Sequence, residues 1–501
     1  MRTFHSYGPV DALDHYCVER KELVDQCIRQ LIGNANKGGH YFTIWGARQT
    51  GKTWLYRQSM EVIKKQYGDH FTVGELSMQK LVFENDDNPT QVFFNSVSSL
   101  FKGSFSIQVN KINAWIEWID LFSKDAGHFD RPLILVIDEF DKLPKQVIDN
   151  LVSLFREMYL NSNQYMLHGL ALVGVRAVLG VDSKSGSPFN VQRSLHVENL
   201  SFDEVQSMFD QYQEESHQHI HPQVIQHLYE QTQGQPGLIG WFGELLTQKY
   251  NSSPDQPIDI NQWHRVYLSA CEVEHNNTVR NIITKARNEY KSNVIKLFTH
   301  ANMHFSFDYD WCNYMYMHGL IGYEKIDDQN RLYHVCRFSS PFIQTRLYNA
   351  FIGEIKDAQD HSMLPLDPLD TLDDVACGTT LNIKALLERY KEYLKRLKES
   401  GHNPWRNQPR RKDFHLTEAV GHFHLYYWLQ MALGIQSTIS PEFPTGNGKV
   451  DLHIEYQEKK GIIEVKSFTN ANDAKLARKQ AANYAKNRIS RCHHCHVCPF
   501  Y

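Results

Sequence analysis

The sequence lacks the features that mark membrane and secreted proteins. Its 501 residues contain no apolar run of the roughly 18 residues that a membrane-spanning helix needs. The first residues, Met1 to His5, are not followed by the apolar region of a signal peptide. The 9 cysteines are odd in number and scattered, so they do not form a disulfide framework. We therefore expect a cytoplasmic protein in a reducing compartment.

Internal repeats and long low-complexity tracts are also missing, whereas length and charge are informative. A chain of 501 residues is too long for a single hydrophobic core, so roughly three to four domains are expected. The net charge of −4 hides an asymmetry. Residues 381–501 carry 20 Lys and Arg against 11 Asp and Glu, a net charge of +9, and the remainder carries −13. The C-terminal part is therefore the better candidate for contact with a polyanion such as DNA.

A complete phosphate-binding pattern, G-x-x-x-x-G-K-[ST], follows the apolar run 41–45. We expect its members to bind a nucleotide: Gly46, Ala47, Arg48, Gln49, Thr50, Gly51, Lys52 and Thr53. A strand before the loop and a helix after it are the context that this motif requires. The glycines let backbone N–H groups wrap an anion, and the helix adds the positive end of its dipole. Lys52 is expected to reach the β- and γ-phosphates of ATP, and the Thr53 hydroxyl to hold Mg²⁺.

The second element of such a site is a buried strand that ends in an acid. Residues 133–137 are apolar and lead to Asp138 and Glu139, as suits the middle of a parallel sheet. We expect Asp138 to coordinate Mg²⁺ through water and Glu139 to polarise the water that attacks the γ-phosphate. A third strand, 169–175, leads to Arg176, which could sense the γ-phosphate or simply cap the edge of the sheet.

The first 250 residues or so resemble an AAA-like ATPase of the signal-transducing STAND type. The matching segments are GARQTGKT, LILVIDE, the strand-end Arg176, SPFNV and the turn Gly234-Gln235-Pro236. The resemblance implies that a helical lid and its turn, including Pro236, contact the nucleotide, and that a winged-helix domain follows. Residues 275–350 fit such a domain, with helical stretches and then a hairpin. A winged helix could read DNA or serve only as a packing module.

A different chemistry is indicated near the C-terminus. A long apolar and aromatic helix is expected over 416–433, followed by a hairpin whose strands contain Asp451 and Glu464. Side chains alternate along a strand, so Glu464 and Lys466 face the same side. Two carboxylates and a lysine in one pocket suit metal-assisted hydrolysis of a phosphodiester. Asp451 and Glu464 would hold Mg²⁺ or Mn²⁺, and Lys466 would position the attacking water or stabilise developing charge.

Residues 383–501 resemble the PD-(D/E)XK nuclease superfamily, with Asp451, Glu464 and Lys466 as its signature. The resemblance implies supporting catalytic roles for Glu418, on the first core helix, and for Gln480, on the helix beyond the strands. The end of the chain has the residue types of a zinc site, but their spacing is too tight for four ligands. We favour a terminal strand there, which the nuclease fold also implies.

Together these patterns predict a multidomain α/β protein. Five parts are expected, namely a P-loop ATPase core (1–200) with a parallel sheet, a helical lid (201–265), a winged-helix domain (266–355), a linker (356–382) and an α/β restriction-endonuclease-like domain (383–501). The predicted function is that of an ATP-binding, ATPase-regulated, metal-dependent DNA endonuclease, with ATP and Mg²⁺ or Mn²⁺ as cofactors. The resemblance implies a role in bacterial defence against phage or mobile DNA. The alternative is a nucleotide-switched regulator with a non-cutting tail that binds DNA or a partner protein. A homo-oligomer is compatible with both.

Overall fold

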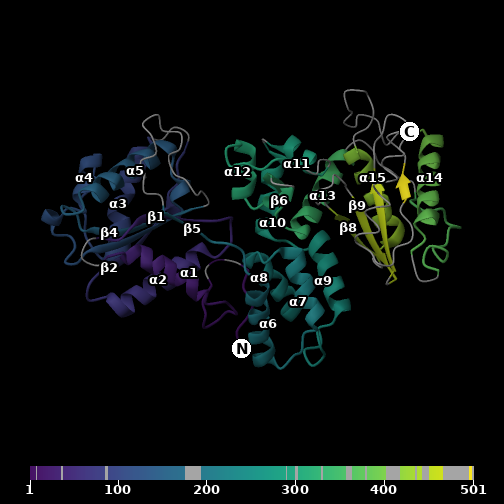
Figure 1. Ribbon diagram of the computed structural model, residues 1–501, viewed down its shortest axis with the longest axis horizontal. Helices are drawn as coiled ribbons and strands as arrows, with labels where there is room; N and C mark the ends of the chain where they lie inside the picture. The colour runs from purple at the N-terminus through teal and green to yellow at the C-terminus, as the bar shows by residue number, and fades with distance from the viewer. Residues whose placement is uncertain are drawn as a thin grey trace. The chain divides into compact units, whose positions relative to one another are not determined.

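The computed structural model divides into two compact units, one of residues 1–219 with 234–247 and one of residues 220–233 with 248–501. Figure 1 labels the elements of both. The structure describes all residues except 7, 9, 35–37, 85–87, 175–192, 289, 299–302, 329–330, 357–363, 378–380, 402–417, 435–436, 443–450, 458, 466–495 and 499–501. None of the helices in the described stretches has both the length and the apolar character needed to cross a membrane.

A parallel sheet of five strands forms the centre of the first unit, in the order β2-β3-β4-β1-β5. Its strands are β1 (Tyr41–Trp45), β2 (Thr72–Ser77), β3 (Leu133–Asp138), β4 (Leu167–Gly174) and β5 (Arg193–His196). Parallel sheets are covered on both faces, so their strands are continuously apolar. Accordingly, every residue of β3 before Asp138 is buried. The predicted P-loop α/β architecture is therefore confirmed for this unit.

Helices cover the two faces of this sheet (Figure 1). On one face lie α1 (Lys21–Ile32) and α2 (Lys52–Tyr67), which share a core with Ile134 and Val136 of β3. On the other face lie α3 (Pro89–Phe105), α4 (Trp115–Asp120) and α5 (Lys145–Leu160), which share a core with Leu135 and Ile137. The alternation along β3 thus supplies two separate cores, and its carboxyl end is left for chemistry.

Three helices follow the sheet where the lid was predicted. They are α6 (Phe202–Ser216), α7 (Pro222–Thr232) and α8 (Pro236–Glu244). At the start of α6, Ser201 and Glu204 form a reciprocal capping box. The helix α8 continues into a π-helical turn, Leu245–Lys249. The boundary between the compact units runs through this region, because α6 and α8 belong to the first unit and α7 to the second.

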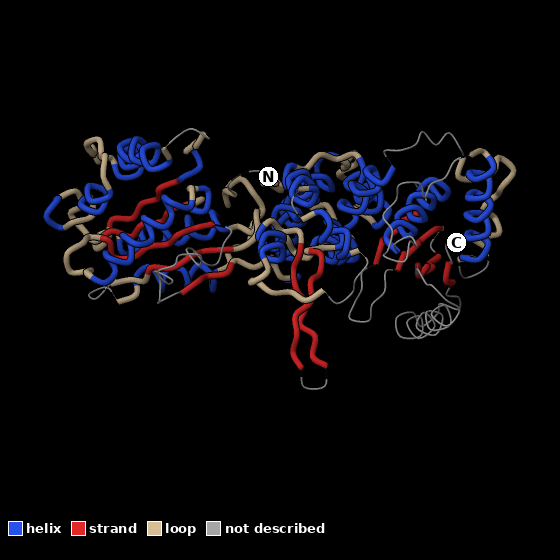
Figure 2. Tube along the Cα trace, turned by 90° about the horizontal axis from the view of Figure 1, so that it is seen from above, coloured by secondary structure: helices blue, strands red, loops and turns tan. Residues whose placement is uncertain are grey.

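The second unit begins with helices and a long hairpin. In chain order they are α9 (Ile260–Glu272), α10 (Asn277–Arg287), α11 (Lys291–Leu297), α12 (Asp310–Met317), β6 (Ile321–Asp328), β7 (Arg331–Phe338) and α13 (Pro341–Lys356). The strands β6 and β7 pair from Ile321 opposite Phe338 to Asp328 opposite Arg331, and Figure 2 shows the hairpin projecting from the helices. The predicted hairpin is confirmed, and its assignment to a winged-helix domain stays a prediction.

The C-terminal part contains a smaller, mixed sheet. Its elements are α14 (Ile383–Glu399), α15 (Glu418–Leu433), β8 (Ser437–Glu442), β9 (Asp451–Tyr456), β10 (Lys459–Val465) and β11 (His496–Cys498). The order is β11-β10-β9-β8, with antiparallel pairs except for the parallel pair of β10 and β11. The terminal strand expected from the sequence is therefore present as β11. The predicted helix that precedes the hairpin is also present, as α15.

Part of the stretch predicted as a linker, 356–382, is packed against these helices. The indole Nε1 of Trp428 donates to the Pro365 carbonyl oxygen at 2.8 Å. The Arg389 guanidinium forms an ion pair with Asp374 at 2.6 Å, and Val375 is fully buried. Pro365 and Asp374 thus have fixed partners on α15 and α14.

The end of α1 approaches β4 so closely that no side chain fits between them. A Cβ on Gly169 would lie 2.2 Å from the Leu31 carbonyl oxygen. We expect Gly169→Ala to destabilise the first unit by about 1–3 kcal/mol, because the backbones must separate. Gly103→Ala, in α3, is the matched control: its Cβ meets open space and should stabilise the helix by up to about 1 kcal/mol. Equal urea midpoints for the two variants of the full chain would contradict this reading of the packing.

Candidate functional site

The loop between β1 and α2 has the backbone shape of an anion-binding turn. Gln49 and Gly51 have left-handed φ values of 60° and 93°, and α2 begins directly afterwards at Lys52. At Gly46 a Cβ would lie 2.7 Å from the Val197 carbonyl oxygen, so only glycine fits. The loop therefore directs the chain into the N-terminal end of α2, where the helix dipole favours an anion.

The Lys52 side chain folds over the loop that precedes it. Its Nζ donates to the carbonyl oxygens of Gly46 and Ala47 at 2.9 and 2.6 Å. Burial lowers the pKa of Lys52 to about 8, although the nearby Asp141 and Asp138 carboxylates oppose this shift. The ammonium is thus held at the centre of the loop by weak backbone acceptors, which phosphate oxygens can replace with a stronger, charge-assisted bond.

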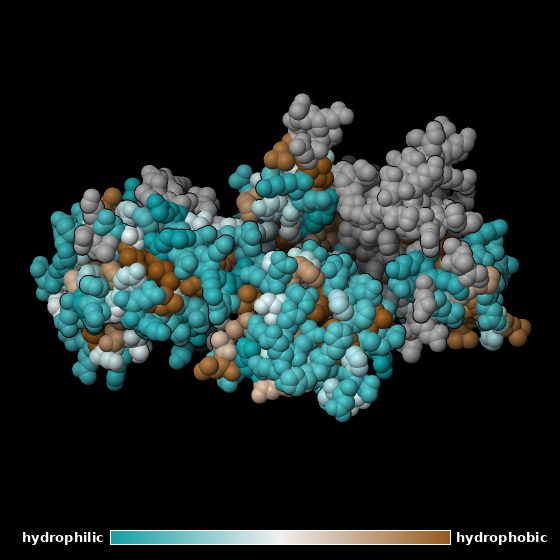
Figure 3. Space-filling model, turned by 60° about the horizontal axis from the view of Figure 1, so that its bottom comes forward, coloured by the Kyte–Doolittle hydropathy of each residue, from teal (hydrophilic) through white to brown (hydrophobic). Residues whose placement is uncertain are grey.

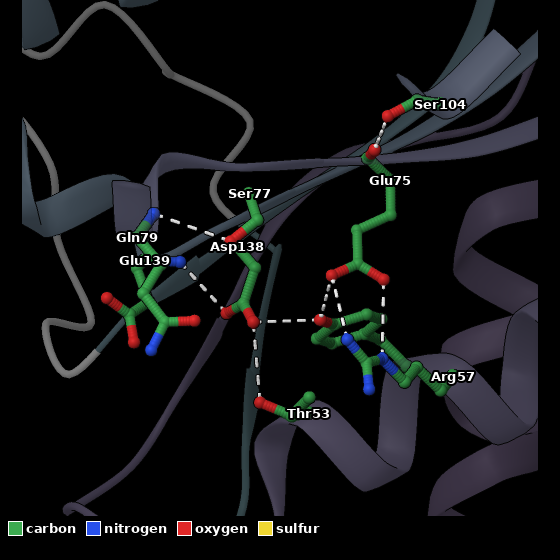
Figure 4. Close-up of polar contacts among 9 residues, drawn as sticks. Thr53, Arg57, Glu75, Ser77, Gln79, Ser104, Asp138 and Glu139 are labelled. Atoms are coloured by element: carbon green, nitrogen blue, oxygen red, sulfur yellow. Dashed lines mark hydrogen bonds and ion pairs between the residues drawn. The ribbon is translucent and has the colours of Figure 1, made fainter. Parts of the chain in front are cut away.

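The Asp138 carboxylate lies at the carboxyl end of β3 and faces α2 (Figure 4). The Thr53 hydroxyl donates to its Oδ2 at 3.4 Å, so the two predicted metal-binding residues lie together. The buried Tyr56 hydroxyl lies 2.8 Å from the same oxygen and 2.7 Å from Glu75 Oε1. Arg57 completes the cluster with two bonds to the Glu75 carboxylate, at 3.2 and 3.3 Å.

This donor set fits a magnesium ion. A hydroxyl and a carboxylate are hard oxygen ligands, which Mg²⁺ prefers, and it takes few of them from the protein besides water and phosphate. Burial raises the pKa of the Asp138 carboxyl, whereas hydrogen bonds from Tyr56 and from the Glu139 N–H partly offset that rise. A carboxylate that is costly to bury gains from a bound cation, so the electrostatics of the site also favour a metal ion.

Glu139 sits on a strained turn directly after β3. It has a left-handed φ of 53°, and its N–H donates to Asp138 Oδ1 at 2.9 Å. Its carboxylate forms an ion pair with Lys142. The residue expected to polarise the attacking water therefore lies beside the expected metal ligand, although its carboxylate is paired on the other side. Its catalytic role stays a prediction.

The lid turn contacts the phosphate-binding loop directly. The Gln235 side chain donates from Nε2 to the Arg48 carbonyl oxygen at 3.1 Å. A Cβ on Gly237 would lie 2.1 Å from Gln49 Oε1, so the turn and the Gln49 side chain of the loop are in close contact. Pro236 lies between these two residues as the first residue of α8. The structure thus brings the predicted turn to the loop, and contact of Pro236 with a nucleotide stays a prediction.

The first unit also contains a cavity of about 1120 Å³ that the sequence did not indicate, and none of the loop residues 46–53 is among those that line it. Arg20, His196 and Glu204 are among the residues that line it. The His196 ring stacks on Trp45, the residue before the loop, with ring centroids 4.0 Å apart. Arg20 has a left-handed φ of 46° and bonds to the Glu198 carbonyl oxygen at 2.9 Å. These residues are distant in sequence from the motifs, so only the fold brings them together at the cavity.

The remaining predicted site residues are described only in part. Arg176, Lys466 and Gln480 lie outside the described residues. Glu418 is the first residue of α15. Asp451 and Glu464 are direct register partners in the antiparallel pair of β9 and β10. Among the described residues, no group of three or more His, Cys, Asp and Glu could hold a metal ion.

Two family models match this chain. Residues 6–253 match the model described as an AAA-like domain. Residues 405–498 match a model described as a domain of unknown function, DUF8371. No curated protein matches the chain. The first match, the loop geometry and the parallel sheet together show that the N-terminal part is a P-loop ATPase domain, as predicted from the sequence.

Several solved structures are distantly similar. A Walker-type ATPase of Pyrococcus abyssi matches over 69% of this chain and 99% of that chain, with 15% identity and a TM-score of 0.46. The Orc1 protein of Aeropyrum pernix, solved in complex with DNA, matches over 70% and 96%, with 11% identity and a TM-score of 0.34. Cdc6p of Pyrobaculum aerophilum matches over 70% and 97%, with 12% identity and a TM-score of 0.38. Likeness this distant transfers no function to the chain.

The Tyr56 hydroxyl gives a test of the geometry around Asp138. We expect Tyr56→Phe to weaken binding of ATP in the presence of Mg²⁺ by about tenfold, because the Asp138 carboxylate loses a fixed position. Binding of ATP in EDTA should change little. Tyr41→Phe is the matched control, since it removes another buried tyrosine hydrogen bond, to the Leu167 carbonyl oxygen, away from the carboxylates. An equal loss of ATP affinity with and without Mg²⁺, measured by fluorescent-nucleotide titration, would argue against a role of Tyr56 in positioning Asp138.

Proposed function

We propose that the chain is an ATP-binding ATPase that controls metal-dependent cutting of DNA by its C-terminal part. The observation that carries the first half is the contact of the Thr53 hydroxyl with the Asp138 carboxylate, directly beside the Lys52 ammonium. The observation that supports the second half is the register of Asp451 opposite Glu464. A role in bacterial defence against phage or mobile DNA is the setting that we infer from the family resemblance.

At the ATP site, each side chain has a definite task. Lys52 exchanges its two carbonyl acceptors for oxygens of the β- and γ-phosphates, and the loop N–H groups bind the same anion. Thr53 and Asp138 would hold Mg²⁺, which supplies charge neutralisation at the phosphates. Glu139 turns its carboxylate from Lys142 to the attacking water. The lid turn moves with the loop when the nucleotide changes, because Gln235 bonds to the loop backbone at Arg48.

At the C-terminal site, the backbone supports a shared metal position. Residues directly opposite in an antiparallel pair lie on one face of the sheet, with Cα atoms about 4.5–5.5 Å apart. Asp451 and Glu464 have this relation, at the end of β9 where the chain enters the sheet. The strand β11 beside β10 agrees with the order of elements that a nuclease of the PD-(D/E)XK type requires. Lys466 follows two residues after Glu464, a spacing that in an extended strand predicts the same face.

DNA is the substrate that the charge distribution favours. The C-terminal 121 residues, 381–501, carry the net charge of +9 derived above, in a chain that is acidic elsewhere. Cations near the reacting phosphodiester raise the local concentration of DNA and neutralise its backbone. The substrate, the metal ion and the carboxylates are thus assigned to the same part of the chain.

The proposal for the ATP site predicts that single substitutions affect ATP binding and ATP hydrolysis separately. Lys52→Ala should abolish ATP binding, because the loop loses its only ammonium. Glu139→Gln should keep binding within about threefold of the wild type but reduce turnover by at least about a hundredfold, since the water loses its general base. Fluorescent-nucleotide titration and phosphate release measure the two quantities. Glu139→Gln with unchanged turnover would remove Glu139 from the mechanism.

The nuclease half is tested by a plasmid-cleavage assay with Mn²⁺ or Mg²⁺. Asp451→Ala should abolish cutting, because a metal ligand is lost, while ATP binding stays unchanged. Glu455→Ala is the matched control, an acid of the same strand that pairs with Lys460 at 3.6 Å. Cutting of the plasmid that persists in the Asp451→Ala variant would contradict the nuclease assignment. Salt-sensitive DNA binding by the wild type without any metal-dependent product would instead favour the nucleotide-switched regulator.

A further inference from the structure

Five aromatic rings cluster at the base of the β6–β7 hairpin and on the helix next to it. They belong to Phe305, Phe307, Tyr316, Tyr323 and His334, and we call this group the wing surface. Ring centroids lie 4.8 Å apart for Phe305 and Tyr323, 5.1 Å for Phe307 and Tyr316, and 5.4 Å for Tyr323 and His334. The cluster is therefore one continuous surface built from the segment before α12, from α12 and from both strands.

Two of the five rings are exposed to solvent, whereas Phe305 is buried beneath them. Phe307 and Tyr323 are each 42% exposed, and the neighbouring Tyr309 and Leu332 are 48% and 64% exposed. Figure 3 shows hydrophobic residues gathered on the projecting hairpin. Single exposed apolar side chains are ordinary, whereas a contiguous group of them marks an interaction site.

One edge of the hairpin also offers its backbone. The outer edge of β7 is covered, because the Phe305 N–H donates to the His334 carbonyl oxygen and the Cys336 N–H to that of Met303. Within the described part of the chain, no strand pairs with the outer edge of β6. A two-stranded hairpin is marginally stable alone, and an open edge readily accepts a further strand.

The charges near the wing surface decide what kind of strand fits. From residue 303 to residue 325 the sequence contains the acids Asp308, Asp310 and Glu324 against one cation, Lys325. Asp308 and Asp310 are exposed beside the aromatic rings, whereas Glu324 is paired with Arg337 at 2.8 Å. DNA binding depends on cations that neutralise phosphates, and α12 with the segment before it provides carboxylates instead. The surface thus suits a cationic occupant.

We propose that the wing surface and the open edge of β6 bind an extended segment of a partner protein that carries Lys or Arg among apolar residues. The backbone of the segment pairs with β6, as in other cases of strand addition. Its apolar side chains cover Phe307 and Tyr323, and its cations meet Asp308, Asp310 and the faces of the aromatic rings. This inference does not rest on the ATPase or nuclease proposals.

A selection experiment with the full-length chain tests the chemistry of the occupant. A display library of random twelve-residue peptides is the probe, and selected peptides should be enriched in Lys and Arg alternating with apolar residues. Tyr323→Ser should weaken binding of the selected peptides at least about tenfold, as expected for an aromatic anchor. Val273→Ser, which changes a 68% exposed residue of the same unit, is the control and should have no effect. Equal binding by both variants overturns the proposal.

Two further measurements keep the test independent of folding defects. The double variant Asp308→Lys/Asp310→Lys leaves the aromatic rings intact. Its affinity for the cationic peptides should fall at least about tenfold. Hydrogen exchange at the amides of 321–328 should slow on peptide binding, because strand addition protects them. Unchanged exchange overturns the strand addition. If Tyr323→Ser instead weakens binding of a duplex or single-stranded DNA, or breaks a dimer seen by sedimentation, then the occupant is DNA or a second copy and the proposal is wrong.

Discussion

The Asp138 carboxylate is the group on which the geometry of the N-terminal unit depends. Two hydroxyls of α2, from Thr53 and Tyr56, hold it, and Tyr56 also reaches Glu75 on the neighbouring strand. Because Ser77 and Asp138 are register partners, these contacts fix α2 over the ends of β2 and β3 together. The phosphate-binding loop precedes α2 without a spacer, so its orientation follows. The Arg57 guanidinium balances the charge of the Glu75 carboxylate, and a cation beside Asp138 would balance the second carboxylate of the pair.

Local geometry explains which parts of this site could be predicted from the sequence. A strand, a glycine-bearing loop and a helix are consecutive in the chain, so the phosphate-binding loop is visible as a pattern, and so is a buried strand that ends in Asp138. Tyr56 was missed because it occupies an ordinary core position in α2, and its partner lies 82 residues away. Arg20 and His196 were missed for the same reason, since they meet only at the cavity. Tertiary packing, and not local pattern, assigns such residues.

In the C-terminal part, the sequence predicted the helices and strands better than the contacts that the residues between them make. Alternating apolar residues identified the hairpin, and pairing then follows from the rule that a one-residue slip would exchange the faces of the strand. The opposite positions of Asp451 and Glu464 are a consequence of that register. The stretch 356–382 shows the limit of composition. Its prolines and aspartates indicated a linker, yet the Pro365 carbonyl and the Asp374 carboxylate bind specific donors on α15 and α14. Composition alone does not reveal such tertiary partners.

The hairpin of the second unit shows why shape alone does not assign a function. A helix followed by a projecting hairpin has the outline of a module that enters a DNA groove, and a resemblance of shape is compatible with many functions. The charge of the surface distinguishes DNA from a protein as its partner, because a surface that contacts phosphates must supply cations. The segment from 303 to 325 supplies only Lys325, whereas residues 381–501 carry the surplus of basic residues. The surplus of basic residues therefore favours the C-terminal part for a polyanion, and we propose the exposed rings of Phe307 and Tyr323 as a surface for a protein.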